Sequence, residues 1–301
     1  MERMNGILVI DKPEGYTSFD VIAILRKKFG QKKVGHMGTL DPMATGVLPV
    51  LFGETAKFQV FSKVHSKKYV ASLQLGITTS TLDITGEVIS KLPSFVSEKD
   101  FKNVVGEFVG EIDQIPPMFS AVKQGGIKLC DLARKGIEVE RKYRKINIFS
   151  LDVLDFNEKT QTAKIEIFCS QGTYVRTLCD DIGKKLGCGA VMTSLRRTFS
   201  NGFDLSQSYP LEKIKVTDVS EIINNYILAT NYLFLDNKKA YVSLNQATRF
   251  QNGGALSLTR IFSKQNFLDQ EIFSIYHKDN FVGIGKVDKI RGEMLVCKAL
   301  R

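Results

Sequence analysis

Residues 35–49 read Gly35-His36-Met37-Gly38-Thr39-Leu40-Asp41-Pro42-Met43-Ala44-Thr45-Gly46-Val47-Leu48-Pro49. This stretch holds three glycines and two prolines among mostly small residues, so its backbone is tightly constrained. Asp41 precedes Pro42, which pushes Asp41 towards an extended conformation and presents its side chain from a stiff loop. An isolated Asp-Pro pair is most often a turn with a helix-capping aspartate. Whether Asp41 does more than this depends on the rest of the chain.

The segments around this loop predict alternating strands and helices. Residues 7–10 read as a short buried strand, and a helix capped by Thr17 or Ser18 follows and stops at Gly30. Residues 67–75 alternate between apolar and polar side chains, which predicts a half-buried strand. The other expected elements are a helix that starts at 97–100, strands near 146–155 and 162–169, and a helix from about 174 to 186.

The second half of the chain changes character twice. Residues 115–145 read as irregular and end in a cationic run, and residues 205–238 are polar and loosely patterned. Short β-like runs separated by Gly, Asn and Asp then predict a small all-β tail. These runs cover residues 240–244, 272–277, 281–287 and 293–298. We therefore place a domain boundary near residue 237.

Composition narrows the class of protein. The chain has 301 residues with 42 Lys and Arg against 32 Asp and Glu, a formal net charge of +10. Its hydrophobic and charged fractions, 43% and 25%, are ordinary for a globular protein and exclude wholesale disorder. The length predicts about two domains. The positive excess favours a polyanionic partner, either a nucleic acid or an acidic membrane surface.

Cysteine and histidine spacing argues against metal and disulfide frameworks. The five cysteines form no CxxC pair and are odd in number, and the three histidines show no zinc-ligand spacing. The apolar run at 7–10 is too short for a signal-peptide core or a membrane span. We expect a reduced, cytoplasmic, metal-free protein.

Five strings, in order from residue 5 to about residue 200, together resemble the bacterial TruB-type tRNA pseudouridine synthases. They are Asp11-Lys12-Pro13-x-Gly15-x-Thr17-Ser18, the 35–49 loop, Lys68-Tyr69 with Leu75-Gly76, Ser170-Gln171-Gly172-Thr173-Tyr174-Val175-Arg176-Thr177, and Leu186-Gly187-Cys188-Gly189-Ala190 with Leu195-Arg196-Arg197. In combination these motifs are very specific. The tail resembles the family's C-terminal PUA domain more weakly.

The resemblance implies a fold and a reaction. The expected fold is α+β, with a pseudouridine-synthase catalytic domain over 1–237 that has a mixed, mostly antiparallel sheet, and an all-β PUA-like RNA-binding domain over 238–301. The implied reaction isomerises uridine 55 in the T arm of tRNA to pseudouridine, without cofactor or metal. The implied partner is tRNA, with no membrane, and we expect a monomer.

The resemblance places the catalytic aspartate of the family at Asp41. A carboxylate there can attack the sugar C1′ or abstract a sugar proton, and the sequence leaves both routes open. A carboxylate that stays charged in a closed pocket needs a cationic partner. Arg176 is the candidate, through a bidentate guanidinium pairing. It lies in the first turn of its expected helix, where the helix dipole disfavours a cation.

The remaining implied site residues surround the base. Tyr69 and Tyr174 would line the uracil pocket, because a flipped base needs flat stacking surfaces, and Tyr69 is also a candidate proton acceptor. Leu195 would close the pocket as an apolar wall. His36 would contact the flipped nucleotide. Lys12 would either support the catalytic loop or face phosphate.

Residues 120–145 resemble the family's RNA-clasping insertion. Their cations could grip phosphates, with Arg141, Lys142, Arg144 and Lys145 densest. Cys130 stands where the family usually has tyrosine, so a stacking role is lost there. Ser80 stands where many members carry an aspartate, and Asp83, at a family acidic position, is given a secondary role.

Other classes of protein compete with this interpretation. One is a catalytically idle protein that binds or folds tRNA on the same scaffold. Another is a relative that acts within a guide-RNA particle on ribosomal RNA, although the long cationic insertion fits the stand-alone tRNA type better. A basic peripheral membrane protein is a remote third, because no basic amphipathic helix supports it.

Overall fold

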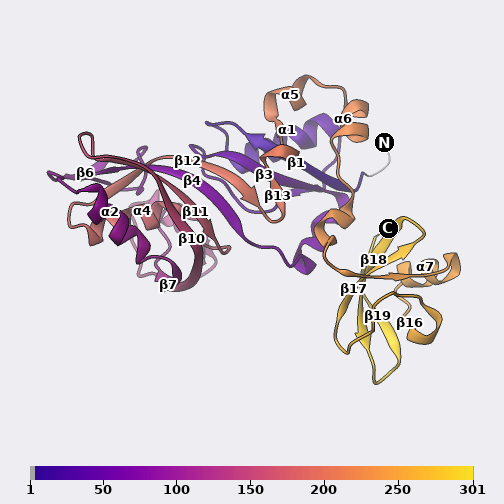
Figure 1. Ribbon diagram of the computed structural model, residues 1–301. Helices are drawn as coiled ribbons and strands as arrows, with labels where there is room; N and C mark the ends of the chain where they lie inside the picture. Colours follow the sequence, from indigo (N-terminus) through magenta and orange to yellow (C-terminus); the bar gives the residue numbers. More distant parts are fainter. Residues whose placement is uncertain (1–3, 301) are drawn as a thin grey trace.

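The computed structural model describes residues 4–300, and one large sheet forms most of it (Figure 1). Its ten strands are β1 (Gly6–Lys12), β2 (Val34–His36), β3 (Thr45–Phe52), β4 (Lys67–Leu75), β7 (Gly110–Gln114), β10 (Arg144–Asn157), β11 (Thr162–Cys169), β12 (Ala190–Ser200), β13 (Phe203–Asp204) and β14 (Tyr209–Pro210). The main path runs β14-β1-β3-β12-β4-β11-β10-β7, while β2 pairs with β3 and β13 with β12. The β1–β14 and β3–β12 pairs are parallel and the others antiparallel, so the expected mixed, mostly antiparallel sheet is confirmed.

Helices cover this sheet. They are α1 (Ser18–Phe29), α2 (Glu98–Gly106), α3 (Leu129–Ala133), α4 (Val175–Lys185), α5 (Leu211–Val216) and α6 (Val219–Asn225). Figure 1 shows α1, α5 and α6 beside β1 and β3, whereas α2 and α4 lie with β10, β11 and β12 at the other end. One buried apolar core extends under both groups, from Leu8 in β1 to Ile222 in α6. The two ends of the sheet are therefore packed as a single body.

Local sequence signals explain the elements that carry the site. Helix α1 starts at a capping box between Thr17 and Asp20 and ends at Gly30, which adopts the left-handed conformation. Strand β4 matches the expected range, and its alternate side chains are buried as a strand between two neighbours requires. Eleven-residue β12 pairs with β4, β3 and β13, and thus joins the two ends of the sheet.

The tail forms a second sheet, in the order β15-β17-β18-β19-β16. Its elements are β15 (Lys238–Tyr241), α7 (Leu244–Gln251), β16 (Leu256–Ser257), β17 (Ile272–His277), β18 (Asn280–Asp288) and β19 (Glu293–Ala299). The sheet has an apolar core of its own that includes Phe250, Phe273 and Met294. The expected β-rich C-terminal region is present, with helix α7 as an addition that the β-like runs did not indicate.

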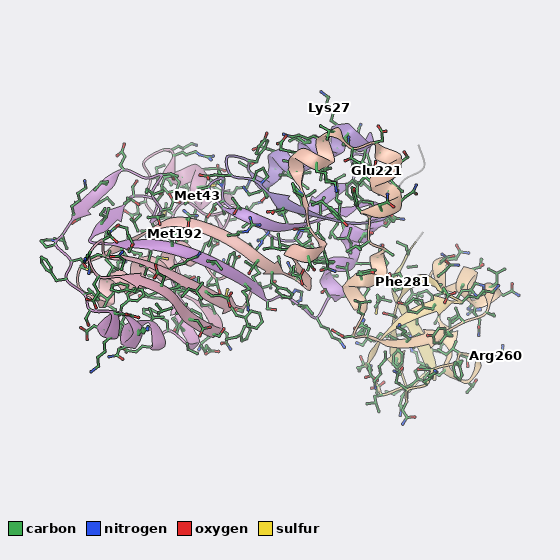
Figure 2. All side chains as sticks on the ribbon, turned by 45° about the horizontal axis from the view of Figure 1, so that its top comes forward. Lys27, Met43, Met192, Glu221, Arg260 and Phe281 are labelled. Carbon is green, nitrogen blue, oxygen red and sulfur yellow. The ribbon has the colours of Figure 1, made fainter. Side chains whose placement is uncertain are left out.

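A third apolar cluster lies where the tail meets the rest of the chain. Phe58 of the 3₁₀ segment η1 (Gly53–Phe61) packs against Phe234 of η3 (Thr230–Phe234) and Phe281 of β18, with ring centroids 5.7–6.1 Å apart. Figure 2 labels Phe281 at this junction. The same cluster includes Met37, which belongs to the 35–49 loop. The tail is thus attached through a packed apolar interface that reaches the loop.

Two segments expected to be irregular contain short regular elements. The 115–145 stretch includes α3 and a two-stranded ribbon of β8 (Lys123–Gln124) and β9 (Ile127–Lys128). Outside these two segments, a similar ribbon of β5 (Ile77–Thr79) and β6 (Val88–Lys91) follows β4. The 205–238 stretch contains α5, α6 and η3. Across residues 4–300, the structure has no helix that is long and apolar enough to cross a membrane.

Replacing Phe58 by alanine should lower the free energy of unfolding by about 3–5 kcal/mol, because it opens a cavity in a fully buried cluster. Urea unfolding followed by circular dichroism measures this change. Val60 lies on the same segment with 77% of its surface exposed, so Val60→Ala is the matched control and should change little. Equal stability of the two variants would show that the tail interface contributes nothing.

Candidate functional site

A buried arginine holds the loop between β2 and β3 through hydrogen bonds to its backbone. Arg197, on β12, is fully buried and donates to the carbonyl oxygens of Val47 at 2.7 Å, Gly38 at 3.1 Å and Thr39 at 3.2 Å. A carbonyl dipole that faces a cation is stabilised in a site of low dielectric. Three donors from one rigid guanidinium therefore fix both ends of the segment that carries Asp41.

A second buried cation holds the same loop near its middle. The Lys12 ammonium donates to the carbonyl oxygens of Tyr16 at 2.6 Å, Pro13 at 2.9 Å and Pro42 at 3.2 Å. Lys12 is fully buried, and this burial lowers its pKa to about 8. Of its two expected roles, the geometry favours support of the loop. The assignment of Lys12 to substrate binding is not favoured, because all three donors already face protein carbonyls.

Close contact between β3 and β12 requires a glycine in the loop. Gly46 has φ +105°, and a Cβ at this position would lie 2.1 Å from the carbonyl oxygen of Arg197. No other residue can occupy this position without moving backbone. The glycine pattern of the sequence therefore reflects how near the loop lies to the strand that carries Arg197.

Asp41 and Arg176 form the expected ion pair. Arg176 Nε lies 3.0 Å from Asp41 Oδ2, and Arg176 Nη2 donates to Asp41 Oδ1 at 3.4 Å. The carboxylate side chain is 34% exposed, whereas the arginine side chain is only 6% exposed. The carboxylate is thus held by two contacts from a buried guanidinium while one side of it stays open. Figure 2 shows the neighbouring Met43 far from Arg260 of the tail.

Arg176 is itself fixed by two other segments of the chain. Its Nη1 donates to Thr81 O at 3.0 Å and lies 3.5 Å from Asp83 Oδ2, and its Nη2 donates to Phe119 O at 2.8 Å. Asp83 is buried and accepts hydrogen bonds from the hydroxyls of Thr81 and Thr85 at 2.7 and 2.5 Å. Asp83 therefore contacts Arg176 directly, a larger role than the sequence indicated.

Tyr69 and Leu195 lie on the two central strands, β4 and β12. Tyr69 is buried opposite Arg197 in the β4–β12 register, and Leu195 is buried opposite Ala71. Burial raises the pKa of Tyr69, while the adjacent Arg197 guanidinium acts in the opposite direction. An aromatic ring, an apolar side chain and a cation thus meet beside the loop.

Tyr174 precedes α4 and is held by a residue that the sequence analysis did not single out. Gln114 accepts from Tyr174 N at 2.8 Å and donates to Tyr174 O at 3.1 Å, so its amide fixes both main-chain groups. Burial raises the pKa of Tyr174, and Asp41 and Arg176 are near enough to influence it. The only sequence signal for Gln114 is its place just before the Ile115-Pro116-Pro117 string.

His36 lies at the start of the loop, partly buried. Its ring lies edge-on to the ring of Phe19, with 6.2 Å between the ring centroids, and Phe19 is 67% exposed. Burial lowers the pKa of His36, and Arg197 and Lys67 act in the same direction. His36 is therefore neutral near pH 7, which suits contact with a base better than with a phosphate.

The expected site residues fall into two groups in space. Asp41 acts electrostatically on Lys12, Tyr69 and Tyr174 and pairs with Arg176, so these side chains surround one carboxylate. Leu195 and His36 border the group through β12 and the loop. The arrangement offers an oriented, partly open carboxylate next to aromatic and apolar side chains. Such a site can deliver a nucleophile or base to a flat neutral ring.

The cationic run at 141–145 is less free than its sequence indicated. Arg141 lies 3.2 Å from both Pro116 O and Glu138 Oε1, and Lys145 lies 2.5 Å from Glu111 Oε1. Lys142 and Arg144 have no ion-pair partner within residues 4–300. Only part of the run is thus available to an external anion.

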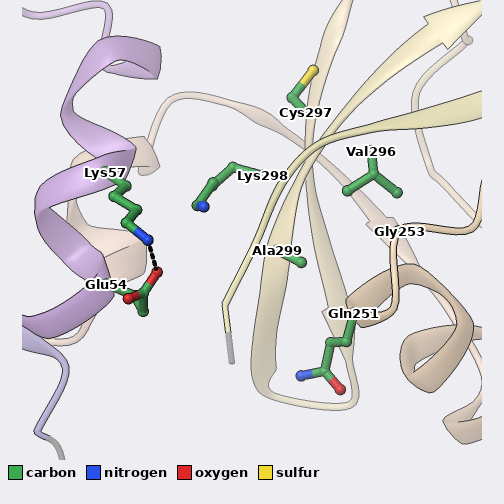
Figure 3. A pocket seen from close by; sticks show the side chains of 8 residues that line it. All are labelled: Glu54, Lys57, Gln251, Gly253, Val296, Cys297, Lys298 and Ala299. Atoms are coloured by element: carbon green, nitrogen blue, oxygen red, sulfur yellow. Dashed lines mark ion pairs between the residues drawn. The ribbon is translucent and has the colours of Figure 1, made fainter.

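Other concave or acidic features do not add to the site. A crevice of about 260 Å³ separates η1 from the tail and is lined by Glu54, Lys57 and Lys298 among others (Figure 3). It lies at the tail junction, away from Asp41. In the described part of the chain, no group of three His, Cys, Asp or Glu side chains is placed to hold a metal ion.

Comparisons with known sequences bear on what such a site does. The family model described as "TruB family pseudouridylate synthase (N terminal domain)" matches residues 26–175, and "tRNA pseudouridylate synthase B C-terminal domain" matches residues 176–233. A Clostridium kluyveri protein called tRNA pseudouridine synthase B is 41% identical over 94% of this chain and 95% of its own. One of the same name from Alkaliphilus oremlandii is 42% identical over 99% and 98%.

Solved structures share the fold. A protein in a Cbf5-Nop10-Gar1 complex matches with a TM-score of 0.72 at 26% identity, covering 98% of this chain and 84% of the other. A protein of an H/ACA RNP bound to a substrate RNA containing 2′-deoxyuridine also has a TM-score of 0.72, at 23% identity and over 98% and 85%. At that identity the second match speaks for the fold alone.

Replacing Arg176 by lysine should reduce the single-turnover rate on an unmodified RNA substrate nearly as much as Arg176→Ala. An ammonium cannot reproduce a guanidinium that contacts Asp41, Thr81, Asp83 and Phe119 at once. Rates at saturating enzyme measure the effect. Lys184, on the same helix and 67% exposed, offers Lys184→Ala as a control. A lysine variant that keeps most of the rate would show that Arg176 supplies charge alone.

Proposed function

This chain belongs to the TruB family of pseudouridylate synthases, and we propose from that membership that it converts uridine 55 in the T arm of tRNA to pseudouridine. It is an isomerase that acts on tRNA, as its relatives' common name states. The position in the tRNA and the identity of the catalytic residue are the finer parts of the proposal.

The proposal rests on the exposure and contacts of the Asp41 carboxylate. Its carboxylate is partly exposed, yet a buried arginine holds it through both oxygens. The same arginine also contacts the buried Asp83, whose carboxylate has no such opening. A charged group that is rigid and open on one side suits attack on a substrate, since it needs no reorganisation before reacting.

In the proposed reaction, the target uridine leaves the RNA stack and enters the site. Asp41 attacks C1′ or removes a sugar proton, and the bond from C1′ to N1 breaks. The uracil turns and C5 bonds to C1′, while the bond between Asp41 and C1′ breaks or the proton taken from the sugar returns to it. The C5 proton leaves, and N1 takes up a proton. Atoms and electrons balance within one nucleotide, so the step needs no second substrate.

The surrounding side chains would control the base while it is detached. Tyr69 and Tyr174 would offer ring surfaces, and Leu195 an apolar wall, which together exclude water. Tyr69 is also the proposed acceptor of the C5 proton. The neutral His36 would contact the flipped nucleotide at the loop edge.

We propose that residues 1–237 form the catalytic domain and residues 238–301 a PUA-like domain that contacts the RNA farther along. The net charge of +10 supports an extended electrostatic contact. We propose that the protein acts in the cytoplasm, and we expect one chain to suffice, since Asp41 and the residues around it come from one copy. The guide-RNA alternative is less favoured, because relatives at 41–42% identity are named for tRNA.

The test is incubation with an unmodified tRNA transcript, followed by chemical adduct formation and primer extension. A stop at position 55 that depends on enzyme is the expected result. Modification at another uridine would contradict the position, and no modification in any tRNA would contradict the activity.

Asp41→Asn should abolish product even at high enzyme excess, while tRNA affinity stays near that of the wild type. The change removes the charge and the nucleophile but keeps the size of the side chain. Product is measured in a single turnover and affinity by filter binding. Product close to the wild-type yield would remove Asp41 from the mechanism.

Neutralising the cationic run should flatten the salt dependence of tRNA binding by ~0.7–0.9 in log–log slope for each lost phosphate contact. Because Arg141 and Lys145 are paired within the protein, Lys142→Gln with Arg144→Gln should produce most of the effect of replacing all four cations. Filter binding between low and moderate salt measures the slope. An unchanged slope in both variants would mean that the run is only solvated surface.

A further inference from the structure

Two fully buried cations and one partly buried cation surround the catalytic loop, and of these only the two fully buried ones have hydrogen-bond partners for their charge within residues 4–300. Lys12 and Arg197 each donate to three backbone carbonyls. Lys67, by contrast, makes no side-chain hydrogen bond or ion pair within residues 4–300. Its ammonium is not among the buried polar atoms that lack a partner, so it keeps contact with solvent and is open to an external acceptor beside the loop.

The position of Lys67 points its charge at the loop. It is the first residue of β4, and its side chain shares a face with Tyr69, two residues on. A Cβ added to Gly38 would lie 3.1 Å from Lys67 Nζ, so the ammonium lies directly against the loop backbone. Along a strand, two residues span about 6.6 Å, so the ammonium and the Tyr69 ring lie near one another on this face.

The groups around Lys67 make the electrostatic potential at its ammonium more positive. Arg197 of β12 lowers its pKa further than burial alone, to about 8, and His36 of β2 lies within electrostatic reach. The neighbouring Cys169 of β11 is the single group that acts the other way, and burial keeps this thiol protonated by raising its pKa to about 11. No carboxylate influences Lys67, so the site is suited to an anion.

We propose that Lys67 binds a backbone phosphate of the RNA beside the target uridine, and thereby anchors the strand while the base enters the site. The proposal rests on the proposed function, since that function supplies the RNA. A phosphodiester fits better than a carboxylate of a protein partner, because Tyr69, on the same strand face, would hold the base of the nucleotide concerned. Lys67 would be a positioning residue with no part in bond breaking.

The experiment compares Lys67→Met and Lys67→Arg with Lys68→Met. Lys68 is the matched control, because it is next in sequence, faces the other side of β4, and pairs with Glu166 at 3.1 Å. The ligand is an unmodified T-arm hairpin RNA, measured by filter binding at several salt concentrations.

We expect Lys67→Met to bind the hairpin about tenfold more weakly and to lose ~0.7–0.9 of salt slope, the value for one phosphate contact. Lys68→Met should stay near the wild type in both. The single-turnover rate at saturating RNA should fall less than the affinity. A methylphosphonate in place of the bound phosphate should weaken the wild type but leave Lys67→Met unaffected.

The pH dependence gives a second readout. A bound anion favours protonated Lys67, so wild-type affinity should hold below the pKa of about 8 and fall as the pH rises through it. Lys67→Arg should remove this fall, since a guanidinium stays charged. Lys12 has a similar pKa but is unchanged in these variants, so it cannot account for a difference between them.

Stability separates this role from a structural one. Removing an unpaired, partly buried charge should leave the melting temperature of Lys67→Met equal or higher, although RNA binding weakens. If Lys67→Met instead binds as Lys68→Met does, or if no methylphosphonate position couples to Lys67, the proposal is overturned. Wild-type pseudouridine formation on the same hairpin is scored in parallel, so failure of the proposed function would be seen separately.

Discussion

The geometry of the site depends on two buried cations that bind backbone carbonyls in place of carboxylates. Lys12 and Arg197 together contact six carbonyl oxygens, three of which belong to the loop between β2 and β3 and a fourth to β3 itself. An acidic partner would compensate each cation but would leave the loop unattached. Because the cations bind main-chain carbonyls instead, their charges are compensated only while the loop keeps its shape. If the loop moved away, it would leave a buried cation without a partner.

Arg176 holds the Asp41 carboxylate in a similar way, through several acceptors at once. Its donors reach Asp41, Asp83 and the carbonyls of Thr81 and Phe119, which come from three separate stretches of chain. The segments after β5 and before β8 are therefore tied to the loop between β2 and β3 by one side chain. An arginine at the start of α4, where the helix dipole is unfavourable, can be tolerated because these acceptors outweigh that dipole.

Local patterns predicted much of the fold, and long-range contacts explain what they missed. Helix α1 and strand β4 followed from a capping residue, a terminal glycine and an alternating apolar pattern. Strand β12 was not predicted, because its residues are buried on parts of both faces and show no single period. The pairing of Asp41 with Arg176 was expected from motifs, whereas the roles of Asp83, Gln114 and Arg197 depend on backbone atoms far away in sequence, which no local pattern encodes.

The apolar junction beneath the loop has a consequence for how RNA is chosen. Met37, from the loop, belongs to the same buried cluster as Phe234 and Phe281, so the tail is attached to the part that carries Asp41 without a slack linker. The distance between the tail and Asp41 is then fixed. In the proposed function one RNA touches both, so it must present its target base at that distance. Discrimination between RNAs would then rest on their folded dimensions as well as on the nucleotides around the target.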